Sequence, residues 1–152
     1  MKPIPQLQHA LESLRLRILR PVTLGVRVLM EQEGRVVLVW HTYEDLWYFP
    51  GGGVEREETL EEAARREARE ELGAELGRLR LLGAYTNFSE YKSDHTLIFV
   101  CHDFTLTGET GREIDRFGFF DLEDLPEKIS PATRRRIEEY RAGSAAPNVG
   151  MW

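Results

Sequence analysis

PGGGVEREETLEEAARREAREELGA, residues 50–74, runs from a glycine loop into a helix with an unusual distribution of charge. At about 100° per residue, the alanine and leucine side chains of residues 59–72 share one broad arc of this helix. Glu67 and Glu71 fall inside the apolar arc, and Glu70 lies at its edge. A helix that buries its alanines therefore brings these carboxylates toward the protein body. Because an unpaired buried carboxylate is costly or takes up a proton, we expect a cation there.

The spacing of these glutamates indicates which cation. Glu67, Glu70 and Glu71 are related as i, i+3 and i+4, so we expect their side chains to converge. Oxygen ligands are typical of Mg²⁺, Mn²⁺ and Ca²⁺, and Mg²⁺ usually shares its coordination shell with substrate phosphates. Beside a glycine loop at a helix N-terminus, the carboxylates predict a metal–phosphate site. The alternative is an ordinary solvated helix face with i, i+4 pairs such as Glu61 with Arg65.

The composition is that of a single globular domain. The chain has 152 residues, of which 41% are hydrophobic and 30% charged, enough for one core. Its formal net charge of −6 predicts no non-specific binding to nucleic acid. No run of about 18 apolar residues is present, so we expect no membrane span. One cysteine, Cys101, suits a reducing compartment, and we expect a cytoplasmic protein.

Hydrophobic patterning predicts the order of strands and helices. Strands are expected over residues 22–30, 35–40, 47–49, 78–88, 95–106 and 117–120. Helices are expected over residues 59–72 and 132–141, the second with Ser130 as its cap and Pro131 at its first position. Strands, a helix, more strands and a final helix indicate an α/β domain with a mixed sheet.

The two ends of the chain have different patterns. Leu7, Leu11, Leu14 and Ile18 form a stripe at 4-3-4 spacing, which predicts an amphipathic helix within residues 1–20. This helix packs on its own domain or forms a homodimer contact, and the pattern leaves both open. Residues 143–152 are rich in small residues and predict a flexible tail. The domain itself is then expected over residues 21–142.

Read from Gly52 to Ala74, the segment has the pattern G-x5-E-x7-R-E-A-x-E-E-x-G-A, which resembles the Nudix box of the MutT-like Nudix hydrolases. Its fixed positions are occupied by Gly52, Glu58, Arg66, Glu67, Glu70, Glu71 and Gly73. Ala68 and Ala74 take the aliphatic positions, and Glu57 stands where the family often has glycine. Seven fixed residues over 23 positions make this a strong motif.

The resemblance implies an α/β/α sandwich with a mixed β-sheet. It also implies a metal-dependent hydrolase that cleaves the diphosphate linkage of a nucleoside diphosphate derivative by water attack at phosphorus. Glu67, Glu70 and Glu71 are then the ligands of Mg²⁺ or Mn²⁺, together with a backbone carbonyl near Gly52, and a glutamate that holds no metal is a candidate base. Glu58 and Arg66 are implied to be a structural pair that holds the loop against the helix.

Further candidates lie outside the box glutamates. Several family members use another acidic residue before a late strand, and Glu113 is our candidate for that catalytic role. The alternatives are Asp115, Glu90 and Asp94. Gly51, Gly52 and Gly53 are predicted to let the backbone approach the substrate phosphates. Tyr91 stands near the position of a tyrosine typical of diadenosine polyphosphate hydrolases, and is a candidate substrate-binding residue.

Two other functions are compatible with this domain. A non-catalytic Nudix domain would bind a nucleotide and regulate a partner, although such domains usually lose box glutamates. A metal-stabilised interaction domain would use the run Arg134-Arg135-Arg136 as a partner surface, although this run is also consistent with a solvated helix face. Metal-dependent turnover of a nucleotide separates the enzyme from both.

Overall fold

The structure is a computed structural model, and it describes residues 11, 14–15, 18–89 and 91–152. The strands are β1 (Val22–Gln32), β2 (Arg35–His41), β3 (Trp47–Tyr48), β4 (Gly51–Gly53), β5 (Ala74–Leu76), β6 (Leu79–Ser89), β7 (Lys92–Cys101), β8 (Phe104–Leu106), β9 (Ile114–Asp121) and β10 (Asn148–Met151). The helices with defined bounds are α2 (Leu60–Leu72) and α3 (Pro131–Ala142).

The main sheet is mixed, as the strand pattern predicted. Its strands follow the order β10-β6-β7-β1-β2-β3, with β4 also pairing with β1 and β9 with β2. β1 and β7 are parallel, as are β6 and β10, and the other pairs in this sheet are antiparallel. β5 and β8 form a separate antiparallel pair beside the C-terminal end of α2. The long strand β1 therefore joins the two halves of the sheet.

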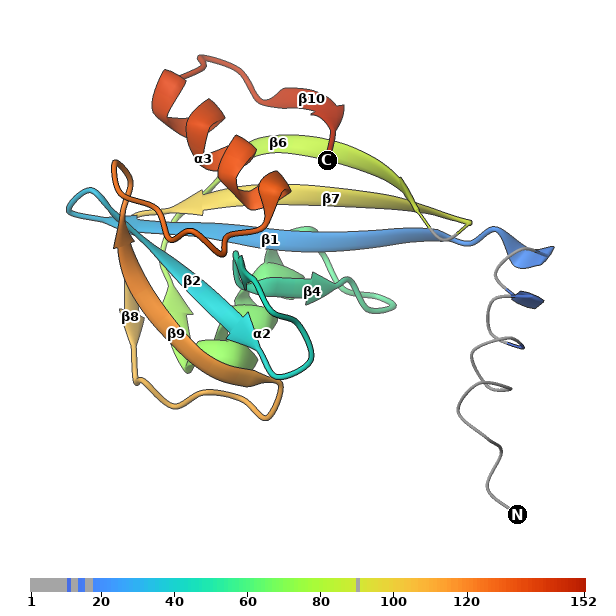
Figure 1. Ribbon diagram of the computed structural model, residues 1–152, viewed down its shortest axis with the longest axis horizontal. Helices are drawn as coiled ribbons and strands as arrows, with labels where there is room; N and C mark the ends of the chain where they lie inside the picture. Colours follow the sequence, from blue (N-terminus) through green and yellow to red (C-terminus); the bar gives the residue numbers. More distant parts are fainter. Residues whose placement is uncertain (1–10, 12–13, 16–17, 90) are drawn as a thin grey trace.

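Helices α2 and α3 lie on opposite faces of the sheet (Figure 1). Side chains alternate between the two faces of a strand, so β1 contributes to both layers of core. Val28 and Met30 pack with Ala68 of α2, whereas Leu29 packs in a second cluster with Ile137 of α3. The fold is therefore the α/β/α sandwich that the sequence predicted.

Helix α2 begins and ends where its sequence indicates. Thr59 is the N-cap, and its side chain and that of Glu62 form a reciprocal capping box. Gly73 ends the helix in the left-handed conformation, with φ of 58°. This termination turns the chain directly into β5.

Three local expectations differ from the structure. The expected strand over 95–106 is two strands, β7 and β8, and the short strand β5 was not expected at all. Residues 143–152 were expected to form a flexible tail, but residues 148–151 form β10, which pairs with β6. The sequence of this segment has no strand pattern of its own, so its pairing with β6 determines its conformation.

The helix expected within residues 1–20 lies mostly outside the described residues. Leu11, Leu14 and Ile18 are described, and their exposed fractions are 58%, 53% and 73%. These side chains are therefore not buried against the rest of the domain. Their involvement in a homodimer stays a prediction. Within the described part of the chain, no helix has the length and apolar character needed to cross a membrane.

The pairing of β4 with β1 generates a first prediction. A Cβ atom at Gly51 would overlap the Val26 carbonyl oxygen and lie 2.8 Å from the Arg27 Cα, and Gly51 has a φ of 141°. Gly53, two residues away, has open space around its Cα. We expect Gly51→Ala to lower the free energy of unfolding by at least about 2 kcal/mol.

The matched control is Gly53→Ala, which we expect to change stability by less than about 1 kcal/mol. Urea unfolding followed by circular dichroism measures both variants. Equal stability of the two variants would contradict the close packing of β4 on β1.

Candidate active site

The glycine loop, residues Gly51–Gly53 of β4, lies between β1 and α2. Gly51 pairs with Arg27, and Gly52 pairs with Val26. On its helix side, a Cβ atom at Gly52 would lie only 2.6 Å from Glu67 Oε1. The carboxylate of Glu67 therefore packs directly against the backbone of the loop. Any residue larger than glycine at position 52 would displace this carboxylate.

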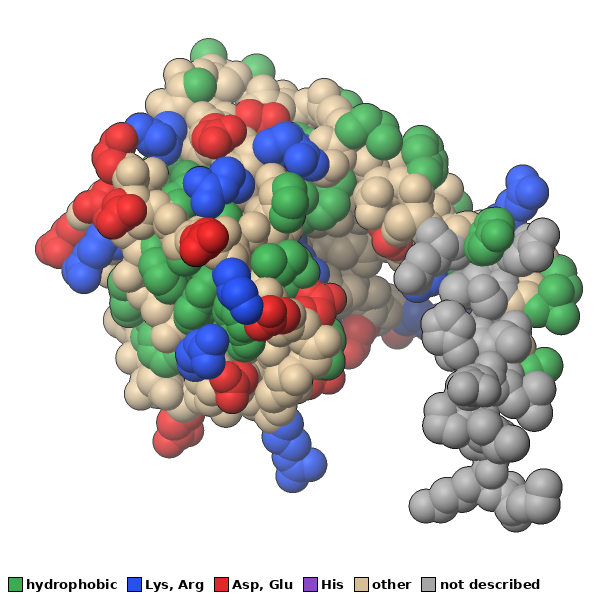
Figure 2. All heavy atoms as spheres, in the orientation of Figure 1, with side chains coloured by type: hydrophobic (Ala, Val, Ile, Leu, Met, Phe, Trp, Pro, Cys, Tyr) green, Lys and Arg blue, Asp and Glu red, His purple; other side chains and the backbone are tan. Residues whose placement is uncertain are grey.

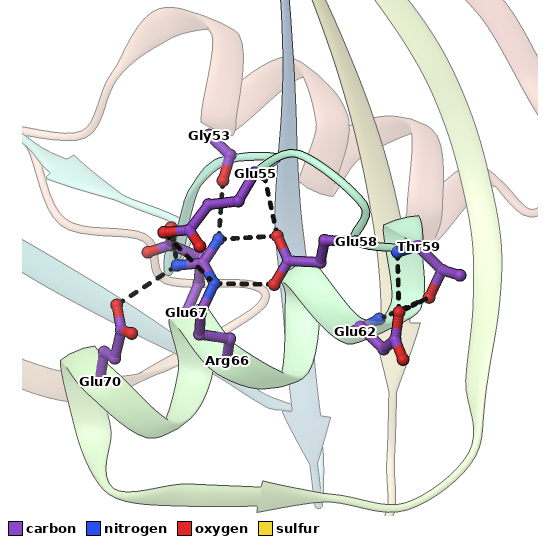
Figure 3. Close-up of polar contacts among 8 residues, drawn as sticks. All are labelled: Gly53, Glu55, Glu58, Thr59, Glu62, Arg66, Glu67 and Glu70. Atoms are coloured by element: carbon purple, nitrogen blue, oxygen red, sulfur yellow. Dashed lines mark hydrogen bonds and ion pairs between the residues drawn. The ribbon is translucent and has the colours of Figure 1, made fainter.

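Arg66 holds the segment after the loop against α2 (Figure 3). Its Nε donates to Glu58 Oε1 at 2.8 Å, and its Nη2 donates to Glu58 Oε2 at 3.0 Å. The same Nη2 donates to the Gly53 carbonyl oxygen at 2.8 Å. The pairing expected between Glu58 and Arg66 is therefore present, and hydrogen bonds from Arg66 lower the pKa of Glu58.

Arg66 also contacts two of the proposed metal ligands (Figure 3). Its Nη1 lies 2.7 Å from Glu67 Oε1 and 3.3 Å from Glu70 Oε2. The Glu67 side chain is 14% exposed, whereas that of Glu70 is 61% exposed. One guanidinium thus balances part of the negative charge of this helix face.

Glu71 is the most buried of the box glutamates, with 6% of its surface exposed. Its Oε2 accepts a hydrogen bond from the Gly51 N–H at 2.8 Å. Burial raises the pKa of Glu71 to about 7, and the negative charges of Glu67 and Glu113 add to this effect. The carboxyl group therefore changes its charge near neutral pH in the absence of a cation.

A cavity of about 230 Å³ collects the acidic residues, and we call it the glutamate cavity. It is lined by Glu67, Glu70, Glu71, Gly111, Arg112, Glu113 and Ile114. The loop before β9 reaches α2 because the Gly111 N–H donates to the Glu71 carbonyl oxygen at 3.1 Å. The structure thus brings Glu113 to the same cavity as the three box glutamates.

The alternatives to Glu113 lie elsewhere. Asp115 forms an ion pair with Arg116 at 3.1 Å and does not line the glutamate cavity. Asp94 lines a different pocket on the sheet. Glu90 lies outside the described residues. Among the three of these acidic residues that the structure describes, Glu113 is the one that lines the glutamate cavity.

The three box glutamates line one cavity, but their carboxylates are not arranged as a ready set of metal ligands. Among the residues that the structure describes, no three acidic, histidine or cysteine side chains are grouped closely enough to hold a metal ion. The physical reason is that Arg66 holds Glu67 and Glu70, while the Gly51 N–H holds Glu71.

The chemistry of the donors nevertheless fits a hard divalent cation. Four carboxylates line one cavity, and burial has raised the pKa of Glu71, as expected for an acid without enough positive charge nearby. Gly52 lines the neighbouring pocket rather than the glutamate cavity, and its carbonyl oxygen lies on the side of Gly25. Its place in a metal site stays a prediction.

That neighbouring pocket has a volume of about 340 Å³, and we call it the sheet pocket. It is lined by Thr23, Leu24, Gly25, Arg27, Gly52, Gly53, Asn87, Lys92, Asp94, His95, Thr96 and Trp152. Tyr91, the predicted substrate-binding residue, lies at the turn between β6 and β7, is 53% exposed, and does not line this pocket. Two of the three loop glycines, Gly52 and Gly53, do line it.

Arg27 is a site residue that the sequence reading missed. Its Nη1 donates to the Gly51 carbonyl oxygen at 2.6 Å and to the Phe49 carbonyl oxygen at 3.3 Å. It lines the sheet pocket, and its charge lowers the pKa of Glu71. The sequence does contain a sign of this position, because Arg27 stands between Val26 and Val28. Side chains alternate along a strand, so Arg27 lies on the face of β1 opposite these two buried valines.

The fold and the site together define a class of protein: an α/β domain with an acidic site where a glycine loop enters a helix. The NUDIX domain family matches residues 19–140, so the chain belongs to this family. The expected family is thereby confirmed.

The chain is similar to curated proteins of known name. It is 35% identical over 71 residues to an RNA pyrophosphohydrolase of Hydrogenovibrio crunogenus, a match that covers 47% of this chain and 43% of that protein. It is 33% identical over 126 residues to diphosphoinositol polyphosphate phosphohydrolase 2 of Rattus norvegicus, covering 78% of this chain and 69% of that protein. The chain thus spans less than half the length of the bacterial relative.

Solved structures share the fold. A MutT NUDIX hydrolase from Burkholderia pseudomallei superposes with a TM-score of 0.71 at 27% identity, over 78% of this chain and 97% of that chain. A MutT protein from Methanosarcina mazei has a TM-score of 0.72 at 22% identity, over 80% of this chain and 94% of that chain, which supports the fold alone.

The raised pKa of Glu71 generates a second prediction. The pKa is about 7 in the folded protein against an ordinary value of 4.5, so the folded state favours the protonated carboxyl. This contribution to stability is complete below pH 4.5 and is lost as the pH rises through 7. We expect Glu71→Gln to stabilise the metal-free protein at pH 8 by up to about 3 kcal/mol, and to have little effect at pH 4.

Thermal unfolding in a chelator at both pH values measures this difference. Glu109→Gln, an exposed change in the loop before β9, is the control and should leave stability unchanged at both. A Glu71→Gln variant no more stable than wild type at pH 8 would show that burial does not destabilise the Glu71 carboxylate.

Proposed function

We propose that this protein is a metal-dependent hydrolase that cleaves the diphosphate linkage of a nucleoside diphosphate derivative. One observation carries the proposal: Glu67, Glu70, Glu71 and Glu113 line a single cavity beside the glycine loop. Membership of the NUDIX family and the names of the relatives, which include pyrophosphohydrolases, support the same reaction class.

The cofactor in this proposal is Mg²⁺ or Mn²⁺. Its ligands in this proposal are the carboxylates of Glu67, Glu70 and Glu71, with a backbone carbonyl near Gly52 as a further oxygen donor. When bound, the cation neutralises phosphate charge and lowers the pKa of coordinated water. Arg66 contacts Glu67 and Glu70, and the Gly51 N–H donates to Glu71, so Glu67 and Glu70 would have to leave or share Arg66 to hold the cation.

The protein's own groups then bind the phosphates and move one proton. The backbone of the glycine loop lies against the substrate phosphates, and Arg27 fixes that loop through the Gly51 carbonyl oxygen. The oxygen of the attacking water forms a bond to phosphorus as the bridging P–O bond breaks. Glu113 accepts the proton of this water. It lines the cavity, and unlike the three glutamates of α2 it is not one of the proposed metal ligands. The leaving phosphate oxygen carries away the bonding electron pair.

The substrate in this proposal is a small nucleotide rather than a nucleic acid. On the face shown in Figure 2, Lys and Arg side chains are interspersed with Asp and Glu, without a large area of positive charge. The formal net charge of −6 agrees with this view. Because one relative is named for RNA, a 5′-triphosphorylated oligonucleotide belongs in the substrate panel.

The third prediction concerns turnover. Across a panel of nucleoside diphosphate derivatives, we expect hydrolysis that depends on Mg²⁺ or Mn²⁺ and stops in a chelator. Glu67→Gln and Glu113→Gln should each lower kcat by about 100-fold or more, because one removes a proposed ligand and the other the proposed base. Phosphate-release or product chromatography measures these rates.

Glu109→Gln is the matched control, because Glu109 is exposed in the same loop as Glu113 and does not line the glutamate cavity. Its turnover should equal that of the wild type. Full turnover by Glu113→Gln would remove this residue from the mechanism. Nucleotide binding without turnover by the wild type would favour a non-catalytic regulatory domain instead.

A further inference from the structure

Strand β10 brings an aromatic side chain to the sheet pocket. Residues Asn148–Met151 run parallel to β6, and the Trp152 N–H donates to the Thr86 carbonyl oxygen at 2.9 Å. Figure 1 shows β10 along the edge of the sheet beside β6, on the side of α3. Trp152 consequently lines the same pocket as the loop glycines Gly52 and Gly53, about 100 positions earlier in the chain.

Helix α3 fixes this strand from the other side. Arg136 Nη1 donates to the Met151 carbonyl oxygen at 2.9 Å, and Arg135 Nη2 donates to the Trp152 carbonyl oxygen at 2.7 Å. Arg136 is only 4% exposed, and its guanidinium lies 4.0 Å from the centre of the Tyr85 ring. A buried arginine thus connects α3, β6 and β10, which indicates that β10 belongs to the folded structure.

A second contact network supports the same arrangement. The hydroxyl group of Tyr85 donates to Glu139 Oε2 at 2.6 Å, and Glu139 Oε1 pairs with Arg136 at 2.9 Å. The Tyr85 and Trp152 rings lie with their centres 6.1 Å apart. The indole is therefore held by Tyr85 on one side while it lines the pocket.

The chemistry of the pocket indicates the shape and charge of its ligand. Its volume of about 340 Å³ is within the range of small-molecule sites. Thr23, Asn87 and Thr96 provide hydroxyl and amide groups, and Asp94 provides a carboxylate acceptor. An aromatic wall beside hydrogen-bonding groups suits a flat heterocycle. Arg27 and Lys92 also line the pocket, and their positive charge suits a phosphate attached to the ring.

The sheet pocket and the glutamate cavity share the glycine loop as a common wall. Gly52 lines the sheet pocket, and its backbone packs against the Glu67 carboxylate, which lines the glutamate cavity. A ligand with a flat ring in the sheet pocket and a diphosphate attached to it would have to pass Gly52 to reach the glutamates. This arrangement relates the ring to the reaction centre of the proposed hydrolase.

We propose that Trp152 is a specificity-determining residue that stacks on the base of the nucleotide substrate, with the polar groups of the pocket contacting the edge of the base. The proposal rests on the function proposed above, because it assigns the group attached to the diphosphate. It commits the sheet pocket to nucleobases and excludes ligands that carry only a sugar and phosphate.

Binding of reaction products tests the proposal without turnover. Isothermal titration calorimetry in a chelator compares the wild type with Trp152→Ala and Trp152→Phe, using AMP, GMP, CMP, UMP and ribose 5-phosphate as ligands. We expect Trp152→Ala to weaken the best-bound nucleotide by about tenfold or more, since stacking on an aromatic ring contributes this much. Trp152→Phe should restore most of the affinity. Binding of ribose 5-phosphate should be equal in all three proteins.

Val149→Ala is the control, because Val149 lies on the same strand, is 88% exposed and does not line the pocket. It should bind nucleotides as the wild type does, and circular dichroism should show all variants folded. The proposal is overturned if the wild type binds no nucleotide, if Trp152→Ala binds nucleotides as well as the wild type, or if it loses affinity for ribose 5-phosphate equally.

A nuclear magnetic resonance measurement distinguishes direct contact with Trp152 from a general structural effect of the substitution. The Trp152 indole N–H resonance, identified by its loss in Trp152→Phe, should shift on addition of the nucleotide in wild type and in Val149→Ala. An unshifted resonance overturns the stacking proposal. Nucleotide binding through Trp152 in a protein that hydrolyses nothing would instead contradict the hydrolase and leave the base-binding role standing.

Discussion

The close contact between the glycine loop and α2 is the constraint on which the site depends. The Gly52 backbone lies against the Glu67 carboxylate, and the Gly51 N–H donates to Glu71 at 2.8 Å. A side chain at Gly51 would clash with the backbone of β1, and one at Gly52 would displace the Glu67 carboxylate. This contact buries Glu71, and burial is the largest cause of its raised pKa. The same backbone that must approach a phosphate thus also sets the protonation of the nearest carboxylate.

Arg66 offsets part of the negative charge of the carboxylates around it. Arg66 contacts Glu58, Glu67 and Glu70 at the same time, with its Nη2 also on the Gly53 carbonyl oxygen. A guanidinium is planar with several donors in fixed directions, which allows one residue to hold a loop and two helix carboxylates. The contacts to Glu58 use Nε and Nη2, whereas those to Glu67 and Glu70 use Nη1, so Arg66 holds the loop and the two helix carboxylates through different nitrogen atoms.

How far the sequence predicts the site depends on the range of the contacts. The burial order of the box glutamates follows from one helical period, and Glu71 is indeed buried while Glu70 is exposed. Helical spacing also brings Glu67, Glu70 and Glu71 to one cavity, but the periodicity of a helix says nothing about the contacts that Arg66 makes with Glu67 and Glu70. The pairing of β10 with β6 and the pocket position of Trp152 depend on contacts between residues more than 60 positions apart, which no local pattern contains. Tyr91 lies in the turn between β6 and β7, outside the sheet pocket, and its role in substrate binding stays a prediction.

The site and the pocket are coupled through the sheet rather than through a loop. β1 supplies Arg27, which holds the Gly51 carbonyl oxygen, and its register with β4 places Gly52 between the two cavities. β6 lies on the other side of β7 and carries β10, so the wall formed by Trp152 and the wall formed by Gly52 belong to one hydrogen-bonded sheet. Strands held in a continuous ladder move little relative to one another, so the separation of the two walls is set by the fold. In the proposed complex, binding of the base at Trp152 would therefore fix where the attached phosphates start.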